Sequence, residues 1–202
     1  MTALPLGIAI LVLIARQASG PWQDPSKIGD VEVRALPPYC RAQGFIRDDL
    51  SAKVSESEIE KWKGLLGPGY LHVHHYCWAL NALNLAHRAS DEGVRQRYYD
   101  YAVKNIEYVQ RNAGPTLPIM PEILVKKGYV LRLMGQDAAS SREFLASIAL
   151  RPDYTPAYAG LSEYYQDLGD REQARRVLEE GLSHSPKSEM LKRKLAELDD
   201  SP

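Results

Sequence analysis

Apolar positions recur at helical spacing over most of the chain after residue 70. A first predicted helix places Tyr76, Leu80 and Leu83 on one face, and a second runs from Gly93 to Asn112. In the second helix, tyrosine and aliphatic side chains repeat three, four and seven positions apart, which is typical of an amphipathic helix. Residues 70–114 are therefore predicted to form an elongated helix pair.

Two segments of 34 residues, 121–154 and 155–188, follow in phase with each other. A fixed period of this size indicates stacked helical units that are too small to bury their apolar faces alone. In each unit a glycine interrupts the helical pattern, where a tight turn needs a positive φ, and a proline follows the second helix. The matched pairs are Leu124 with Tyr158, Gly135 with Gly169, Phe144 with Leu178 and Pro152 with Pro186.

The second segment resembles a tetratricopeptide repeat, whose pattern is W-x2-L-G-x2-Y, A-x3-F and P. Ser162 stands where the family has glycine, and in the first segment Leu124 replaces the aromatic residue and Ser140 the alanine. The resemblance implies an all-α solenoid of helical hairpins, in which 70–114 is a divergent repeat led by Trp78. With Thr155 as position one, the matching residues are Tyr158, Leu161, Tyr165, Gly169, Ala174, Leu178, Gly181 and Pro186.

The remaining segments are predicted to pack against these repeats. Residues 21–69 form a proline- and glycine-rich arm with one short helix, for which Ser55 and Glu58 supply a capping box. The arm also contains Leu36-Pro37-Pro38-Tyr39-Cys40, which is expected to be extended around its prolines. Residues 189–199 are predicted to form an amphipathic capping helix over the last repeat.

The first fifteen residues contain no charged side chain. Such a run is shorter than the roughly 20 residues of a transmembrane helix and fits the apolar region of an export signal. Residues 1–20 are therefore interpreted as an export signal or an N-terminal membrane anchor, with a plain buried helix as the third alternative. Either of the first two would place the rest of the chain in the periplasm, free or anchored to the inner membrane.

Composition narrows the classes of function. The net charge of −1 shows no excess of basic residues that would attract the phosphates of nucleic acid, so no nucleic-acid partner is expected. The sequence contains no GxSxG, P-loop or dinucleotide-binding pattern, and we expect neither enzymatic activity nor a cofactor.

Cys40 and Cys77 are the two cysteines of the chain. In an oxidising compartment they are predicted to form a disulfide that joins the arm to the first long helix. The alternative is a metal or haem site that uses His72, His75 and Cys77. On a helix His74 points about 200° away from His72, so one ion cannot readily bind all the histidines. If they bind no metal, the histidines are expected to pack beside Tyr76 and Trp78.

The resemblance also indicates where a partner would bind. In a tetratricopeptide solenoid the first helices of the repeats line a concave groove that receives a peptide or a helix. We therefore predict a non-enzymatic protein-binding scaffold or assembly factor of a cell-envelope complex, with a metal- or haem-handling envelope protein as the alternative. The residues expected to face the groove are Glu122, Val125, Tyr129, Arg132, Ala159, Glu163, Gln166 and Asp167.

Overall fold

The computed structural model describes residues 22–43 and 54–200, and these residues form helices and no strand. The all-α prediction is therefore confirmed. In chain order the helices are α1 (Asp30–Arg34), α2 (Pro38–Arg41), α4 (Glu56–Leu66), the 3-10 helix η1 (Gly67–His72), α5 (Val73–Arg88), α6 (Glu92–Ala113), α7 (Met120–Leu133), α8 (Asp137–Leu150), α9 (Thr155–Asp167), α10 (Arg171–His184) and α11 (Glu189–Asp200).

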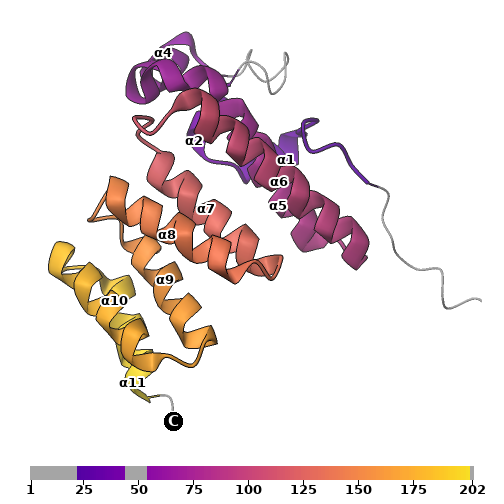
Figure 1. Cartoon of the computed structure of the whole chain (residues 1–202). Helices are drawn as coiled ribbons and strands as arrows, with labels where there is room; N and C mark the ends of the chain where they lie inside the picture. The colour runs from indigo at the N-terminus through magenta and orange to yellow at the C-terminus, as the bar shows by residue number, and fades with distance from the viewer. Residues whose placement is uncertain (1–21, 44–53, 201–202) are drawn as a thin grey trace, which may run out of the picture.

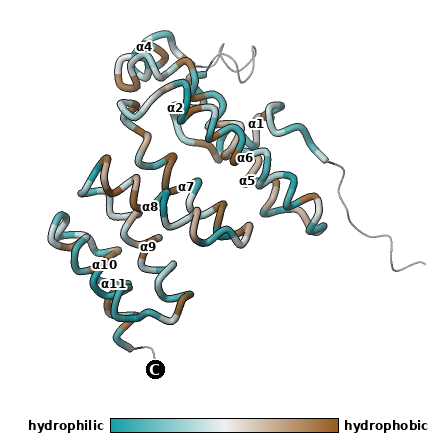
Figure 2. Tube along the Cα trace, in the orientation of Figure 1, coloured by the Kyte–Doolittle hydropathy of each residue, from teal (hydrophilic) through white to brown (hydrophobic). Residues whose placement is uncertain are grey.

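Consecutive helices pack as hairpins that stack along one direction (Figure 1). The pairs are α5 with α6, α7 with α8, and α9 with α10. Gly135 and Gly169 have φ values of 70° and 76° in the turns within the second and third pairs, as the 34-residue period predicts. Hydrophobic and polar residues alternate along each of these helices (Figure 2), so each hairpin has an apolar side to bury against its neighbours.

Phe144 joins the two regular repeats. Its side chain is completely buried, and it lies against the backbone of Gly128 on α7 and of Gly160 on α9. A Cβ atom at either glycine would lie 2.5 Å from the phenylalanine ring, so only glycine permits this close approach. The ring therefore holds α7, α8 and α9 together as one packed unit.

Helix α11 closes the end of the stack, as predicted for a capping helix. Leu191 and Leu198 are buried against the last hairpin, while most of the remaining surface of α11 is polar. Toward the N-terminus, Ser55 immediately precedes α4 and its hydroxyl accepts a hydrogen bond from the backbone N–H of Glu58, which confirms the predicted N-cap.

The arm packs on α5 and is covalently joined to it. Cys40 and Cys77 form a disulfide and are both fully buried, so the predicted pairing is confirmed. The side-chain amide of Asn81 also donates to the carbonyl of Pro25 across 3.0 Å. These contacts hold the arm against α5, although the joined residues are far apart in sequence.

One prediction for the arm is wrong. Pro37 is extended, but Pro38 begins the one-turn helix α2 instead of continuing the extended chain. Proline is well suited to the first position of a helix because its φ is already helical and the backbone donor that it lacks has no partner there. As a result the ring of Tyr39 turns inward and is buried.

The N-terminal segment 1–20 lies outside the described residues, so its interpretation as an export signal or anchor stays a prediction. Among the helices of residues 22–43 and 54–200, none is long and apolar enough to cross a bilayer.

Candidate functional site on the inner face of the repeats

The inner face, as we define it, is the side of the stack formed by α7, α9 and α11, and ion pairs connect these helices. Arg132 on α7 donates from Nη1 to Oε2 of Glu163 on α9 across 2.7 Å. Lys194 on α11 donates from Nζ to the other carboxylate oxygen of Glu163 across 2.6 Å. Asp167 pairs with the second terminal nitrogen of Arg132. The carboxylate of Glu163 therefore connects α7, α9 and the capping helix α11, and Arg132, Glu163 and Lys194 are all partly buried.

Tyr129 forms the apolar wall beside this network. Its ring meets Phe144 edge-on at a centroid distance of 5.3 Å. Burial, and next the nearby carboxylate of Glu163, raise the pKa of Tyr129 to about 12, so its hydroxyl keeps its proton at neutral pH. A hollow of about 290 Å³ opens between the phenol, the exposed Leu133 and the charged side chains Arg132, Asp137 and Asp167. It combines an apolar wall with a charged rim.

The other predicted groove residues have different surroundings. Val125 and Ala159 are 5% and 1% exposed, which corrects their assignment to the groove, because the helices pack too closely there for a partner to reach them. Gln166 is exposed on α9. Lys194 joins the inner face although its helix was expected only to cap the stack; continuing the repeat register into residues 189–199 is the signal that would have found it.

Glu122 is occupied by the protein itself. Its Oε1 accepts hydrogen bonds from the hydroxyl of Tyr39 on the arm, at 2.7 Å, and from that of Tyr76 on α5, at 3.0 Å. The carboxylate, after the larger effect of burial, raises the pKa of both tyrosines, so both remain donors. The arm therefore covers the inner face at the start of α7.

The alternative prediction, a metal site that includes Cys77, is wrong about its sulfur ligand. Cys77 is bonded to Cys40, so it has no thiolate to offer an ion. The ring of His75 stacks on Tyr108 at 3.7 Å, and its Nδ1 lies 2.7 Å from Oδ1 of Asn105. Within the described ranges, no three or more His, Cys, Asp or Glu side chains are grouped so that they could hold a metal. The histidines here pack with aromatic rings.

The histidine cluster predicts a loss of stability in mild acid. Burial, and then the repulsion of a protonated His75, lower the pKa of His74 from its ordinary value of 6.5 to about 4. The unfolded chain takes up this proton near pH 6.5 and the folded chain does not, so protonation favours unfolding as the pH falls between these values. We expect urea denaturation to show a falling free energy of unfolding across this window. His74→Gln should flatten the curve; an unchanged slope would contradict the assignment.

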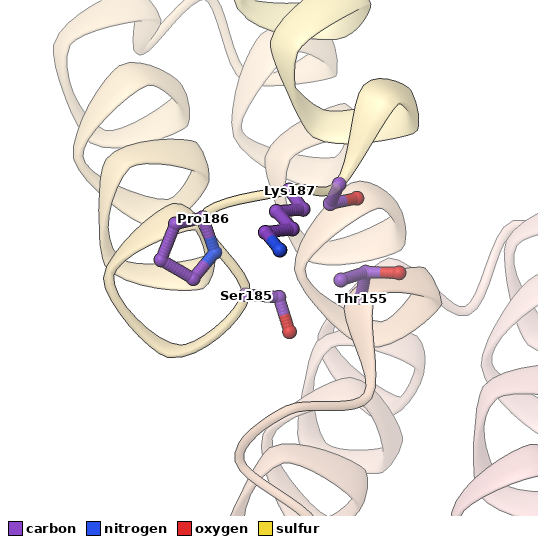
Figure 3. Close-up of a pocket in the computed structure, with 5 residues that line it drawn as sticks. Thr155, Ser185, Pro186 and Lys187 are labelled. Atoms are coloured by element: carbon purple, nitrogen blue, oxygen red, sulfur yellow. The ribbon is translucent and has the colours of Figure 1, made fainter.

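A second hollow, of about 490 Å³, lies between the start of α9 and the loop from α10 to α11 (Figure 3). It is lined by Thr155, Ser185, Pro186, Lys187 and Ser188. The hydroxyl of Ser185 donates to the carbonyl of Asp153, and that of Ser188 accepts from the first turn of α11. These hydroxyls therefore hold the loop in place.

Comparison with known proteins identifies the fold. TTC0263, a thermophilic TPR protein of Thermus thermophilus, superposes with a TM-score of 0.58 at 19% identity, over 83% of this chain and 94% of that one. The first TPR of Spaghetti (RPAP3), bound to an HSP90 peptide, matches with a TM-score of 0.44 at 18% identity, over 60% of this chain and 92% of its own. A scan of protein-family models and a search of curated protein sequences give no match.

The stacked hairpins and the shared inner face define a helical-hairpin repeat protein. More specifically, the repeats have the tetratricopeptide fold, which confirms the resemblance found in residues 121–188.

Proposed function

We propose that this protein is a non-enzymatic scaffold that binds a segment of a partner protein on the inner face. The observation that carries the proposal is the hollow beside Tyr129 and Leu133, which is bordered by Arg132 and Asp167 of the ion-pair network that connects α7, α9 and α11. An exposed leucine next to organised charges suits an amphipathic protein segment, which supplies both apolar and polar groups. Helical-hairpin packing supports this arrangement because it keeps the first helices on one side.

The contacts indicate how such a segment would bind. An apolar side chain of the partner would enter the hollow against Leu133 and the Tyr129 ring. A carboxylate of the partner could take the place of Asp167 on Arg132, because Asp167 is the more exposed of the two acidic partners of that guanidinium. The bridge from Glu163 to Lys194 would remain intact and hold α9 against α11.

We also propose that the scaffold works outside the cytoplasm, as an assembly factor of a cell-envelope complex. Two features support this location: the charge-free run of residues 1–15, and the disulfide, a bond that persists in oxidising compartments. Because few repeats make a shallow surface, an isolated site should bind modestly. Attachment to the membrane beside the partner would raise its effective concentration.

A site-specific photo-crosslinker tests the binding face. Placed at the exposed Gln166 of the full chain, it should capture one discrete partner in cells. Arg132→Ala should reduce that capture at least about tenfold, since a hydrogen bond to a charged group contributes roughly 1.5–3 kcal/mol. Circular dichroism of the variant checks that the fold is retained.

A matched control uses the same crosslinker at Glu180, which is exposed on α10, a second helix of a repeat. We expect no capture of the partner from that position. Equal capture from Gln166 and Glu180, or capture that is unaffected by Arg132→Ala, would show that the partner binds elsewhere.

A further inference from the structure

Helix α6 carries a stripe of alternating basic and aromatic residues. Successive members lie four or three residues apart, a spacing that keeps side chains on one face of a helix. The two arginines and the lysine are exposed, and both tyrosines are half-buried. We call this face the basic-aromatic stripe; it consists of Arg97, Tyr101, Lys104, Tyr108 and Arg111.

The stripe borders the interface with the repeats along one edge, at Lys104. Helix α6 turns Glu107 and Gln110 toward α7, where both contact the ammonium group of Lys127. Asp100 and Glu107 line a hollow on that side of α6, which Lys104 borders. Asp100 and Glu107 therefore lie toward α7, at the edge of the stripe.

Aromatic rings from other segments extend the stripe at both ends. Trp22 lies 6.2 Å from Tyr101 between ring centroids, and the guanidinium of Arg97 lies 5.3 Å from the Trp22 ring. At the other end, Tyr108 stacks on His75, whose ring lies 4.6 Å from Trp78. The result is two groups of rings on this side of the protein, Trp22 with Tyr101 and Tyr108 with His75 and Trp78, with the cations of α6 beside them.

The charged residues of the stripe itself are all positive. Three carboxylates lie beside it: Asp100 lines the same hollow as Lys104, Glu107 lies 4.0 Å from Arg111, and Asp24, near Tyr101, is hydrogen-bonded by Ser26. The whole chain has a net charge of −1, so the stripe is a local exception. It would attract an anionic surface.

We propose that the basic-aromatic stripe contacts the headgroup layer of an anionic lipid bilayer. Tryptophan and tyrosine favour the membrane interface, and lysine and arginine near the surface are attracted to anionic lipids. Trp22, the first described residue, belongs to this surface, and only residues 16–21 separate it from the charge-free run. Six residues span at most about 20 Å, so a chain held by residues 1–15 would keep this face near the bilayer. This inference rests on the proposed membrane location but not on partner binding to the inner face.

Tryptophan quenching by brominated lipids tests the proposal on the full chain. Two variants each keep one reporter: Trp62→Phe/Trp78→Phe retains Trp22, and Trp22→Phe/Trp78→Phe retains Trp62. Trp62 packs edge-on against Tyr39, which reaches toward Glu122, and it serves as the control. With vesicles containing brominated phosphatidylglycerol, Trp22 should be quenched and Trp62 should not. Equal quenching of both, or none at Trp22, overturns the proposal.

Charge reversal then separates the stripe from the N-terminal segment. Arg97→Glu/Lys104→Glu/Arg111→Glu should bring the quenching of Trp22 down to the level of Trp62. The control is Arg176→Glu/Lys187→Glu/Arg193→Glu, which changes net charge equally at exposed positions on α10, α11 and the loop between them and should leave quenching unaltered. Equal effects of the two triple variants would contradict a specific surface.

The same proteins are titrated with a single-stranded oligonucleotide, because basic and aromatic residues together can also bind nucleic acid. Oligonucleotide binding that the stripe variant abolishes, without lipid quenching of Trp22, would replace the membrane proposal. Crosslinking at Gln166 is read separately, so failure of this inference and failure of the inner-face proposal can be told apart.

Discussion

Replacing Phe144 with alanine is expected to lower the free energy of unfolding by about 3–5 kcal/mol, the usual range for removing a buried phenylalanine. The loss should fall at the upper end, because the ring fills the space between the glycine backbones of two helices that cannot readily close the gap. Urea denaturation followed by circular dichroism measures the change. A lower cooperativity of the transition would show that the two repeats have begun to unfold separately.

The matched control is Leu145→Ala on the same helix. Leu145 is 50% exposed, and a substitution at such a surface position usually changes stability by no more than about 0.5 kcal/mol. If both variants lost the same stability, the loss could not be assigned to packing at the junction, because alanine is the best helix former and neither substitution weakens α8 through helix propensity.

Removing the disulfide should have the second large effect. Cys40 and Cys77 are 37 residues apart, and closing a loop of this size is worth about 3 to 4 kcal/mol in the chain-entropy account. The double variant Cys40→Ala/Cys77→Ala should lose this stability and release the arm from α5. Denaturation gives the energy, and limited proteolysis of residues 22–43 reports the release.

Comparison with the reduced wild-type protein provides the control. Treatment with a dithiol should reproduce the loss in the wild-type chain and leave the double variant unchanged. If the variant kept both its stability and its protease resistance, the hydrogen bonds from Tyr39 and Asn81 would suffice to hold the arm.

The sequence predicted the repeats well because their signals are local and periodic. The predicted unit 155–188 begins at the residue where α9 begins, and α7 begins one residue before the predicted start at Pro121. Gly135 and Gly169 mark their turns because each needs a positive φ, which is visible in the residue type alone. The Ser55 cap was predictable for the same reason.

The site was harder to predict because its contacts join distant segments. Repeat position placed Val125 and Ala159 in the groove, but burial depends on how closely neighbouring helices pack, which position alone does not give. The hydrogen bond from Tyr39 to Glu122 joins residues that are 83 positions apart, and no pattern of neighbouring residues predicts it. The basic-aromatic stripe was also missed, because basic and aromatic residues that are scattered along the sequence meet only on the helix surface.

The hydrogen bond from Tyr39 to Glu122 places the arm across the inner face at the start of α7. Helices α7, α9 and α11 lie along this face at a spacing of roughly 10 Å, so the face has room for about six residues of extended chain. A segment bound along this face would meet the arm at the start of α7. The free end of a partner chain therefore fits this face better than the middle of a long polypeptide.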